Sequence, residues 1–348
     1  MRAKGSAQVA VTGIGPVSRL GIGAKELAAA PTVAGAAGPA EGAPEIRELD
    51  NFHPAEFLGR RGWRLLPRAT RMALAAARLA LPGQDDLGAP PPERTGVVIG
   101  TNFAVDEVVD RIDRTLLAEG VSGISPVECP NFAVNVPVSQ VSLTYGLKAF
   151  NVTLVDLFTA GCTSLLLGAR ALRTGRADAV LTGAVEGLPP DGAGQLCGPE
   201  ADEGSACLLH LEPADAARDR GALVHGLLTG GAHRMLPAEP AAASRVSESV
   251  LNRLGDRPLT AVRLHVPLGE HAAYATEAVE GWAARREVPD GVTVIRGGAQ
   301  AGATGVLALA QYLARPAGRP PYGDVAFVTL GPQGHLVALR VSRDGGTS

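Results

Sequence analysis

The chain has 348 residues, which is enough to bury a large core and to form two or three domain-sized units. Its 32 basic and 35 acidic residues leave a formal charge of -3 with no long run of either sign, which argues against nucleic acid as the main partner. The four cysteines have no paired spacing, so neither a disulfide framework nor a zinc site is indicated: Cys129, Cys162, Cys197 and Cys207.

The N-terminus from Met1 to Gly5 has no signal-peptide pattern, and no segment has the apolar length of a membrane span. We therefore expect a soluble cytoplasmic protein without membrane contact. The run from Val9 to Gly15 is typical of a buried strand that ends in a glycine turn. Apolar periodicity then predicts a helix over about 68–81, a strand over 97–100, a helix over 106–119, a strand–helix–strand unit over 152–157, 159–174 and 179–183, and strands over 207–211 and 223–228.

After a crossover near 230–245 the alternation returns. It predicts helices over 244–254, 271–286 and 300–314 and strands over 261–265, 292–295, 325–330 and 335–341. Strands that alternate with helices favour a mainly parallel sheet covered on both faces. We place the boundary between the two halves at residue 230, which gives units 1–230 and 231–348. Two ordinary α/β domains would produce the same pattern.

The two halves contain similar segments at corresponding places. Residues 158–165 and 298–305 each open a helix that is small or apolar all round, and such helices belong in the interior. Two buried helices between two sheets describe an α/β fold with five layers, αβαβα, made of two pseudo-repeated halves. This arrangement resembles the thiolase-like fold.

The run from Ala149 to Phe158 resembles the strand that enters the catalytic elbow of β-ketoacyl synthases, where the motif is roughly Gly-Pro-Ser-x-Thr-Val-Asp-Thr-Ala-Cys. When this motif is aligned without a gap, the nucleophilic cysteine of that family corresponds to Phe158. The run from Ala171 to Asp178 resembles the family's Ala-Leu-Arg-x-Gly-x-x-Asp, and its spacing gives the same register. Because a phenyl ring cannot become a thiolate, the resemblance implies a condensing-enzyme fold without its nucleophile. It covers most of the chain, with further matches over 9–27, 94–101, 139–148 and 201–209.

Active members of that family also use two histidines, which stabilise the enolate and oxyanion formed as malonyl loses CO2. The first lies in Val-x-Ala-His-Gly-Thr, and here 262–267 keeps His265 but not the Gly-Thr. The second lies in Gly-His-x-x-Gly-Ala-Ala-Gly, and here 298–305 puts Ala299 at that histidine. The glycine-rich Phe-Gly-Phe-Gly-Gly loop is reduced to 329–334. Two of the three chemical groups are therefore missing in this register.

Cys162 offers a second interpretation, because Ala-Gly-Cys-Thr-Ser looks like an active motif. Using it requires a four-residue insertion before it and an equal deletion after it, which places it one helical turn beyond Phe158. A helix N-terminus lowers a thiol pKa, whereas a cysteine one turn deeper among leucines is usually a packing residue. The alternative that stays open is an active β-ketoacyl-ACP synthase using Cys162 and His265.

A ketosynthase fold without its chemistry resembles a chain-length factor, the partner subunit of type II polyketide synthases. The resemblance implies a heterodimer with an active ketosynthase, an acyl carrier protein that bears the growing chain, an acyl tunnel across the interface, and no cofactor or metal. Such a subunit would control chain length during decarboxylative condensation. Phe158, where aromatic systems commonly have Gln, and the short chain favour the divergent factors of polyene-making systems.

The segment 105–118 aligns without gaps with the helix that supplies tunnel gates in that family. Apolar residues repeat on it at helical spacing and predict a stripe toward the tunnel: Val105, Val108, Val109, Ile112 and Leu116. Residues 130–135, with Phe132, resemble another interface and tunnel segment. An ordinary core helix would show the same stripe.

A third hypothesis is a nucleotide-binding oxidoreductase, because Gly13 and Gly15 follow a strand. The third glycine of the dinucleotide fingerprint would be Ser18, and Pro16 crowds the turn, so the signal is weak.

Overall fold

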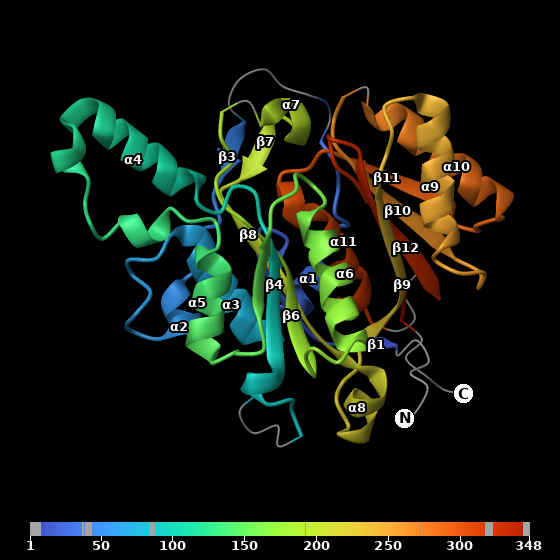
Figure 1. Cartoon of the computed structure of the whole chain (residues 1–348), viewed down its shortest axis with the longest axis horizontal. Helices are drawn as coiled ribbons and strands as arrows, with labels where there is room; N and C mark the ends of the chain where they lie inside the picture. The colour runs from blue at the N-terminus through green and yellow to red at the C-terminus, as the bar shows by residue number, and fades with distance from the viewer. Residues whose placement is uncertain are drawn as a thin grey trace.

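The computed structural model describes residues 8–36, 38, 44–83, 88–191, 193–269, 271–316 and 323–343. Two five-stranded halves dominate it (Figure 1). The N-terminal half has the order β5-β4-β6-β8-β1 and consists of β1 (Val9–Ser18), β4 (Thr95–Gly100), β5 (Asn151–Leu154), β6 (Ala179–Glu186) and β8 (Ser205–Pro213). In it, β4 is parallel to β5 and β6, and β8 is antiparallel to β6 and β1.

The C-terminal half repeats this topology. Its order is β11-β10-β12-β13-β9, from β9 (Gly226–Met235), β10 (Ala261–Val266), β11 (Val292–Arg296), β12 (Asp324–Leu330) and β13 (His335–Ser342). Here β10 is parallel to β11 and β12, and β13 is antiparallel to β12 and β9. The halves join where Val9–Val11 of β1 pairs with Gly226–Leu228 of β9. The boundary predicted at residue 230 therefore falls inside β9.

Helices form three further layers. The helices α6 (Ala160–Arg173) and α11 (Thr304–Ala314) lie in the centre, and their buried residues share one core cluster with both sheets (Figure 1). The outer face of the first half is covered by α3 (Arg68–Ala80) and α5 (Val136–Tyr145). The outer face of the second half is covered by α9 (Pro240–Asn252) and α10 (His271–Arg285). The predicted five-layered α/β fold is confirmed.

Small residues explain how the two central helices approach each other. A Cβ added at Gly161 would lie 2.6 Å from Val306 Cγ2 and 2.9 Å from the carbonyl oxygen of Gly302. A glycine at this position therefore lets α6 pack directly on the turn that precedes α11. This close contact fixes the spacing of the two loops that carry the candidate site.

The remaining elements are short or lie at the rim. They are β2 (Gly21–Ile22), β3 (Glu45–Arg47), β7 (Glu200–Asp202), α1 (Ala24–Ala29), α2 (Pro54–Leu58), α4 (Asp106–Glu119), α7 (Gly194–Cys197), α8 (Ala214–Asp219) and 3-10 turns at Pro92–Arg94, Val121–Gly123, Cys129–Asn131 and Ala301–Ala303. Figure 1 shows α4 standing away from the layered body. Within the described ranges, no helix combines the length and apolarity that a membrane crossing requires.

Candidate functional site

The loop between β5 and α6 forms a sharp elbow at Phe158. Its φ is 70°, one of three positive values among the described non-glycine residues. The amides of Thr159 and Ala160 both donate to the carbonyl oxygen of Asp156, at 3.1 and 2.8 Å, and close the turn. Backbone strain of this kind costs about 1–3 kcal/mol and persists where the surroundings hold it. The strand predicted over 152–157 ends at Leu154 because this turn begins there.

The side chain of Phe158 is completely buried at the start of α6. It packs in a small cluster with Phe103, Leu157, Ala193, Cys197 and Ala301. The nearby cavity beside Phe103 and Cys197 measures about 10 Å³, which is space for about one water molecule. The phenyl ring therefore fills the elbow, and little free space remains beside its cluster.

His265, on β10, faces the same ring. The two ring centroids are 5.1 Å apart, and His265 is buried. Its Nε2–H donates to the carbonyl oxygen of Gly297 at 2.9 Å, while Nδ1 has no hydrogen-bond partner among the described residues. Burial lowers the pKa of His265 to about 4, against the opposing effect of the Gly297 bond. The imidazole is therefore neutral at physiological pH.

Cys162 lies in the first turn of α6, since that helix begins at Ala160. The expectation that it sits one turn inside the helix is wrong in this respect. Its thiol is buried, accepts a hydrogen bond from Thr329 Oγ1 at 3.3 Å, and has its pKa raised by burial to about 11. Desolvation therefore opposes formation of the thiolate, although the thiol lies near the helix N-terminus. Cys162 and His265 both reach the space beside Gly305.

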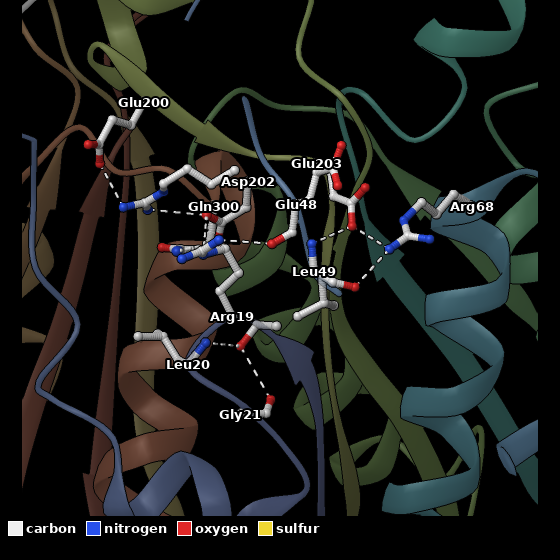
Figure 2. A network of polar contacts seen from close by, with 12 residues as sticks. Arg19, Leu20, Gly21, Glu48, Leu49, Arg68, Glu200, Asp202, Glu203 and Gln300 are labelled. Atoms are coloured by element: carbon white, nitrogen blue, oxygen red, sulfur yellow. Dashed lines mark hydrogen bonds and ion pairs between the residues drawn. The ribbon is translucent and has the colours of Figure 1, made fainter. Parts of the chain in front are cut away.

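Ala299 is half-buried in the loop between β11 and α11, and that loop is tied to β7. The carbonyl oxygen of Ala299 accepts from the amide of Asp202 at 2.9 Å, and Gln300 Nε2 donates to Asp202 Oδ2 at 2.6 Å. Arg47 also donates to Asp202 at 3.1 Å and to Glu200 at 2.6 Å. Figure 2 shows Glu200, Asp202 and Gln300 grouped in this polar network. These contacts fix the loop, but it carries a methyl group where a catalytic histidine is expected.

Comparisons with known proteins agree with this geometry. Residues 8–197, more than half of the chain, match the model of the β-ketoacyl synthase N-terminal domain family. The chain belongs to the β-ketoacyl synthase family. Among curated relatives, 3-oxoacyl-[acyl-carrier-protein] synthase 2 of Staphylococcus aureus is 25% identical over 61% of this chain and 60% of that protein. The enzyme of the same name from Coxiella burnetii is 26% identical over 68% of this chain and 66% of that protein. The chain thus spans about 60% of the length of the Staphylococcus relatives.

Solved structures of ketosynthases share the whole fold. The ishigamide ketosynthase/chain length factor matches with a TM-score of 0.77 at 18% identity, covering 97% of this chain and 99% of that one. The type II polyketide ketosynthase AntDE, solved with its acyl-carrier protein AntF, matches with a TM-score of 0.74 at 20% identity and the same coverage. At these identities the likeness shows the thiolase-like fold that ketosynthases adopt.

The apolar stripe over 105–116 was predicted to face an acyl tunnel. In the structure its residues fall into a buried group and a more exposed group. Val105 and Val108 are buried at 6% and 1% exposure, so the core interpretation holds for them. Val109 and Leu116 are 39% and 41% exposed, and Ile112 is half-buried. Phe132, on the following segment, is 53% exposed. The outer part of the stripe and Phe132 therefore lie at the surface of this chain.

The sequence motifs did not predict two polar features of the structure. Asp156, two residues before Phe158, accepts from Nδ1 of His335, whose Nε2 lies 3.2 Å from His233 Nδ1. Glu186, at the end of β6, is buried, accepts from the amides of Asn102 and Phe103 at 2.9 Å, and has its pKa raised to about 7 by burial. A buried glutamate that ends an apolar strand is itself a signal that could have been noted.

Proposed function

We propose that this chain is a non-catalytic chain-length factor that pairs with an active ketosynthase and shapes the tunnel for the growing acyl chain. The observation that carries the proposal is the buried phenyl ring of Phe158 at the elbow. A condensing enzyme needs a thiolate there, because the thiolate accepts the acyl group before carbon–carbon bond formation. Ala299, in place of the second histidine, supports the same conclusion.

An uncovered sheet edge supports a protein partner. Among the described strands β5 is the edge of its half and pairs with β4 alone. Val155, just after β5, is 61% exposed. A free edge offers unpaired backbone groups to a strand of another chain. In a heterodimer the two central sheets would meet at this edge.

Exposed apolar side chains on and after α4 support the same partner. We call this set the α4 face, and it consists of Val109, Leu116, Leu117, Val121, Val127, Phe132 and Val134, which are between 37% and 88% exposed. Exposed apolar side chains in this number on one segment favour an interaction site. On our proposal Val109, Ile112, Leu116 and Phe132 lie at the far end of the partner's tunnel, and Val105 and Val108 support them from the core.

The second candidate function is an active synthase that uses Cys162 and His265. One observation favours it, because both side chains approach Gly305. The raised pKa of the Cys162 thiol and the neutral His265 oppose it, since among the described residues no group beside the thiol supplies a stabilising positive charge.

Reconstitution tests the proposal. The chain alone, a ketosynthase partner alone and the pair are each incubated with malonyl-loaded acyl carrier protein, and acyl lengths are read by mass spectrometry. We expect no turnover by the chain alone and products of defined length from the pair. Turnover by the isolated chain that is lost in Cys162→Ala would establish the synthase instead.

A further inference from the structure

The outer side of the N-terminal half contains a cavity that the proposed function does not use. Its volume is about 690 Å³, which lies within the range of small-molecule sites. It is lined by residues of α2, α3, α5 and β8, by the connections after α2 and α3, and by the loop before β4. Figure 1 shows these helices grouped on one side of the sheet, with α6 on the other. None of the described residues that line it belongs to the cluster around Phe158.

One wall of this cavity is apolar. It is formed by side chains from α2, the α2–α3 connection, α3 and the segment after α5: Phe57, Leu58, Leu66, Leu74 and Leu147. Trp63 and a run of prolines complete it. Such a wall accepts an alkyl chain, because removing methylene groups from water is favourable.

The lining of the cavity also includes cationic side chains. Residues 57–84 contain six arginines and no acidic residue, although the whole chain has a formal charge of -3. Two of these arginines already have partners: Arg68 pairs with Glu203, and Arg71 donates to the carbonyl oxygen of Leu66 at 2.7 Å. Arg61 and Arg78, by contrast, line the cavity and are exposed.

Neither Arg61 nor Arg78 is paired with a described acidic side chain. Asp85 and Asp86 lie outside the described residues. The charge of Arg78 reaches the cavity wall, because it opposes the burial that raises the pKa of Tyr145 to about 12. The polar side chains of Gln140 and Thr144 lie on the same helix as Tyr145 and also line the cavity.

We propose that this cavity binds a linear amphiphile with a carboxylate head group, its alkyl chain against the apolar wall and its carboxylate at the guanidinium groups of Arg61 and Arg78. Guanidinium groups recognise carboxylates through parallel hydrogen bonds and so select them over neutral head groups. The site does not depend on the proposed function, since it shares no residue with the elbow or the α4 face.

Trp63 provides a local probe, because it lines the cavity while the second tryptophan, Trp282, is buried in the core of the other half. A brominated decanoate is titrated into the full chain and tryptophan fluorescence is followed. We expect saturable quenching that is absent in Trp63→Phe, and binding of unbrominated decanoate by calorimetry at least about tenfold tighter than that of decanol.

Two sets of variants test the head-group contact and the apolar-wall contact independently. The double change Arg61→Gln/Arg78→Gln should weaken decanoate binding about tenfold or more, whereas the distant, exposed Arg253→Gln should not. Thr144→Trp, which fills the cavity from α5, should abolish binding, whereas Leu143→Trp on the adjacent, 75% exposed position should leave it intact. An unchanged thermal midpoint shows that each variant is folded.

Three results would overturn the proposal. One is decanoate binding no tighter than decanol. The second is no effect of the double arginine change, which would mean that these guanidinium groups do not hold the carboxylate. The third is binding to phosphatidylglycerol vesicles without binding to decanoate, which would make the site a lipid head-group contact.

Discussion

The phenyl ring of Phe158 lies against the imidazole of His265, with centroids 5.1 Å apart and planes tilted by 53°. The contact joins the elbow of the first half to β10 of the second half. Nδ1 of His265 has no hydrogen-bond partner among the described residues and borders the space beside Gly305 that Cys162 Sγ also borders. His265 is therefore a neutral packing partner of Phe158. The residue at position 158 offers the imidazole a phenyl ring and no thiol.

Cysteine labelling distinguishes the inert chain from the alternative synthase. Cys129 is exposed, whereas Cys162, Cys197 and Cys207 are buried and have raised pKa values. We expect iodoacetamide to label the native chain at Cys129 alone, and malonyl-loaded carrier protein to leave Cys162 unmodified, as read by peptide mass spectrometry. The Cys129→Ser variant is the control and should label only after unfolding. Acylation of Cys162 within seconds in the native state would contradict this prediction.

A charge on the α4 face should separate the two subunits. Phe132→Asp would place a carboxylate in an apolar interface, where an unpaired charge costs several kcal/mol. We expect loss of co-purification with the ketosynthase partner, measured by affinity capture of a tagged partner. Leu223→Asp, at a position 70% exposed outside this face, is the matched control and should keep the complex. Equal retention of both variants would place the interface elsewhere.

The length of the product should follow the volume of the outer stripe. Ile112→Ala or Leu116→Ala opens space at the proposed tunnel end and should shift products longer, whereas Val109→Trp should shorten them. Val108→Ala is the control on the same helix: this residue is 1% exposed, so truncation should destabilise the chain by roughly 2 kcal/mol without changing length. Product lengths come from mass spectrometry of the reconstituted pair. Lower yield at unchanged length in all four variants would identify a purely structural helix.

Glu186 should make the stability of the chain depend on pH. Its pKa is raised from 4.5 to about 7 in the folded chain, so the native state holds a proton that the unfolded state releases. The associated stability is complete below pH about 4.5 and is lost as pH rises toward 7, roughly 3 kcal/mol in total. Glu186→Gln removes this dependence, so its free energy of unfolding relative to the wild type should rise between pH 5 and pH 8. Urea titrations at both pH values measure it, and a parallel pH dependence in both chains would be evidence against the shift.

His265 contributes a slope of the opposite sign. Its pKa is lowered from 6.5 to about 4, so the unfolded state binds the extra proton, and stability is lost as pH falls from 6.5 toward 4. The two buried groups therefore offset each other between pH about 4.5 and 6.5. For that reason the Glu186 measurement compares variant and wild type at the same pH.

Local periodicity predicted most of the fold. The central helices were expected to be buried because 158–165 and 298–305 have no polar side to face water, and the structure places both between the sheets. The limits of elements were less predictable. The helix expected from residue 300 begins with a 3-10 turn and becomes α-helical at Thr304, and β9 extends to Met235 within the segment predicted as a crossover. Pairing with β13 stabilises that extension, and such long-range pairing leaves no local trace.

The candidate site was predictable only in part. Phe158 and Ala299 follow from aligning short motifs, because each motif fixes a register. The contact between Asp156 and His335 joins residues 179 positions apart, and no spacing rule connects them. The exposure of the outer α4 stripe was equally hidden, since an apolar stripe looks the same whether it meets the core or another chain.

The left-handed backbone at the elbow has a counterpart in the second half. Ala301, three residues before α11, has a φ of 44°, as Phe158, two residues before α6, has 70°. Neither position carries a nucleophile. The bend is thus a property of the repeated strand–helix connection, and it survives whatever side chain it presents. A geometric search for catalytic elbows will therefore return chains like this one, and only the identity of the side chain at the bend separates a working enzyme from a scaffold.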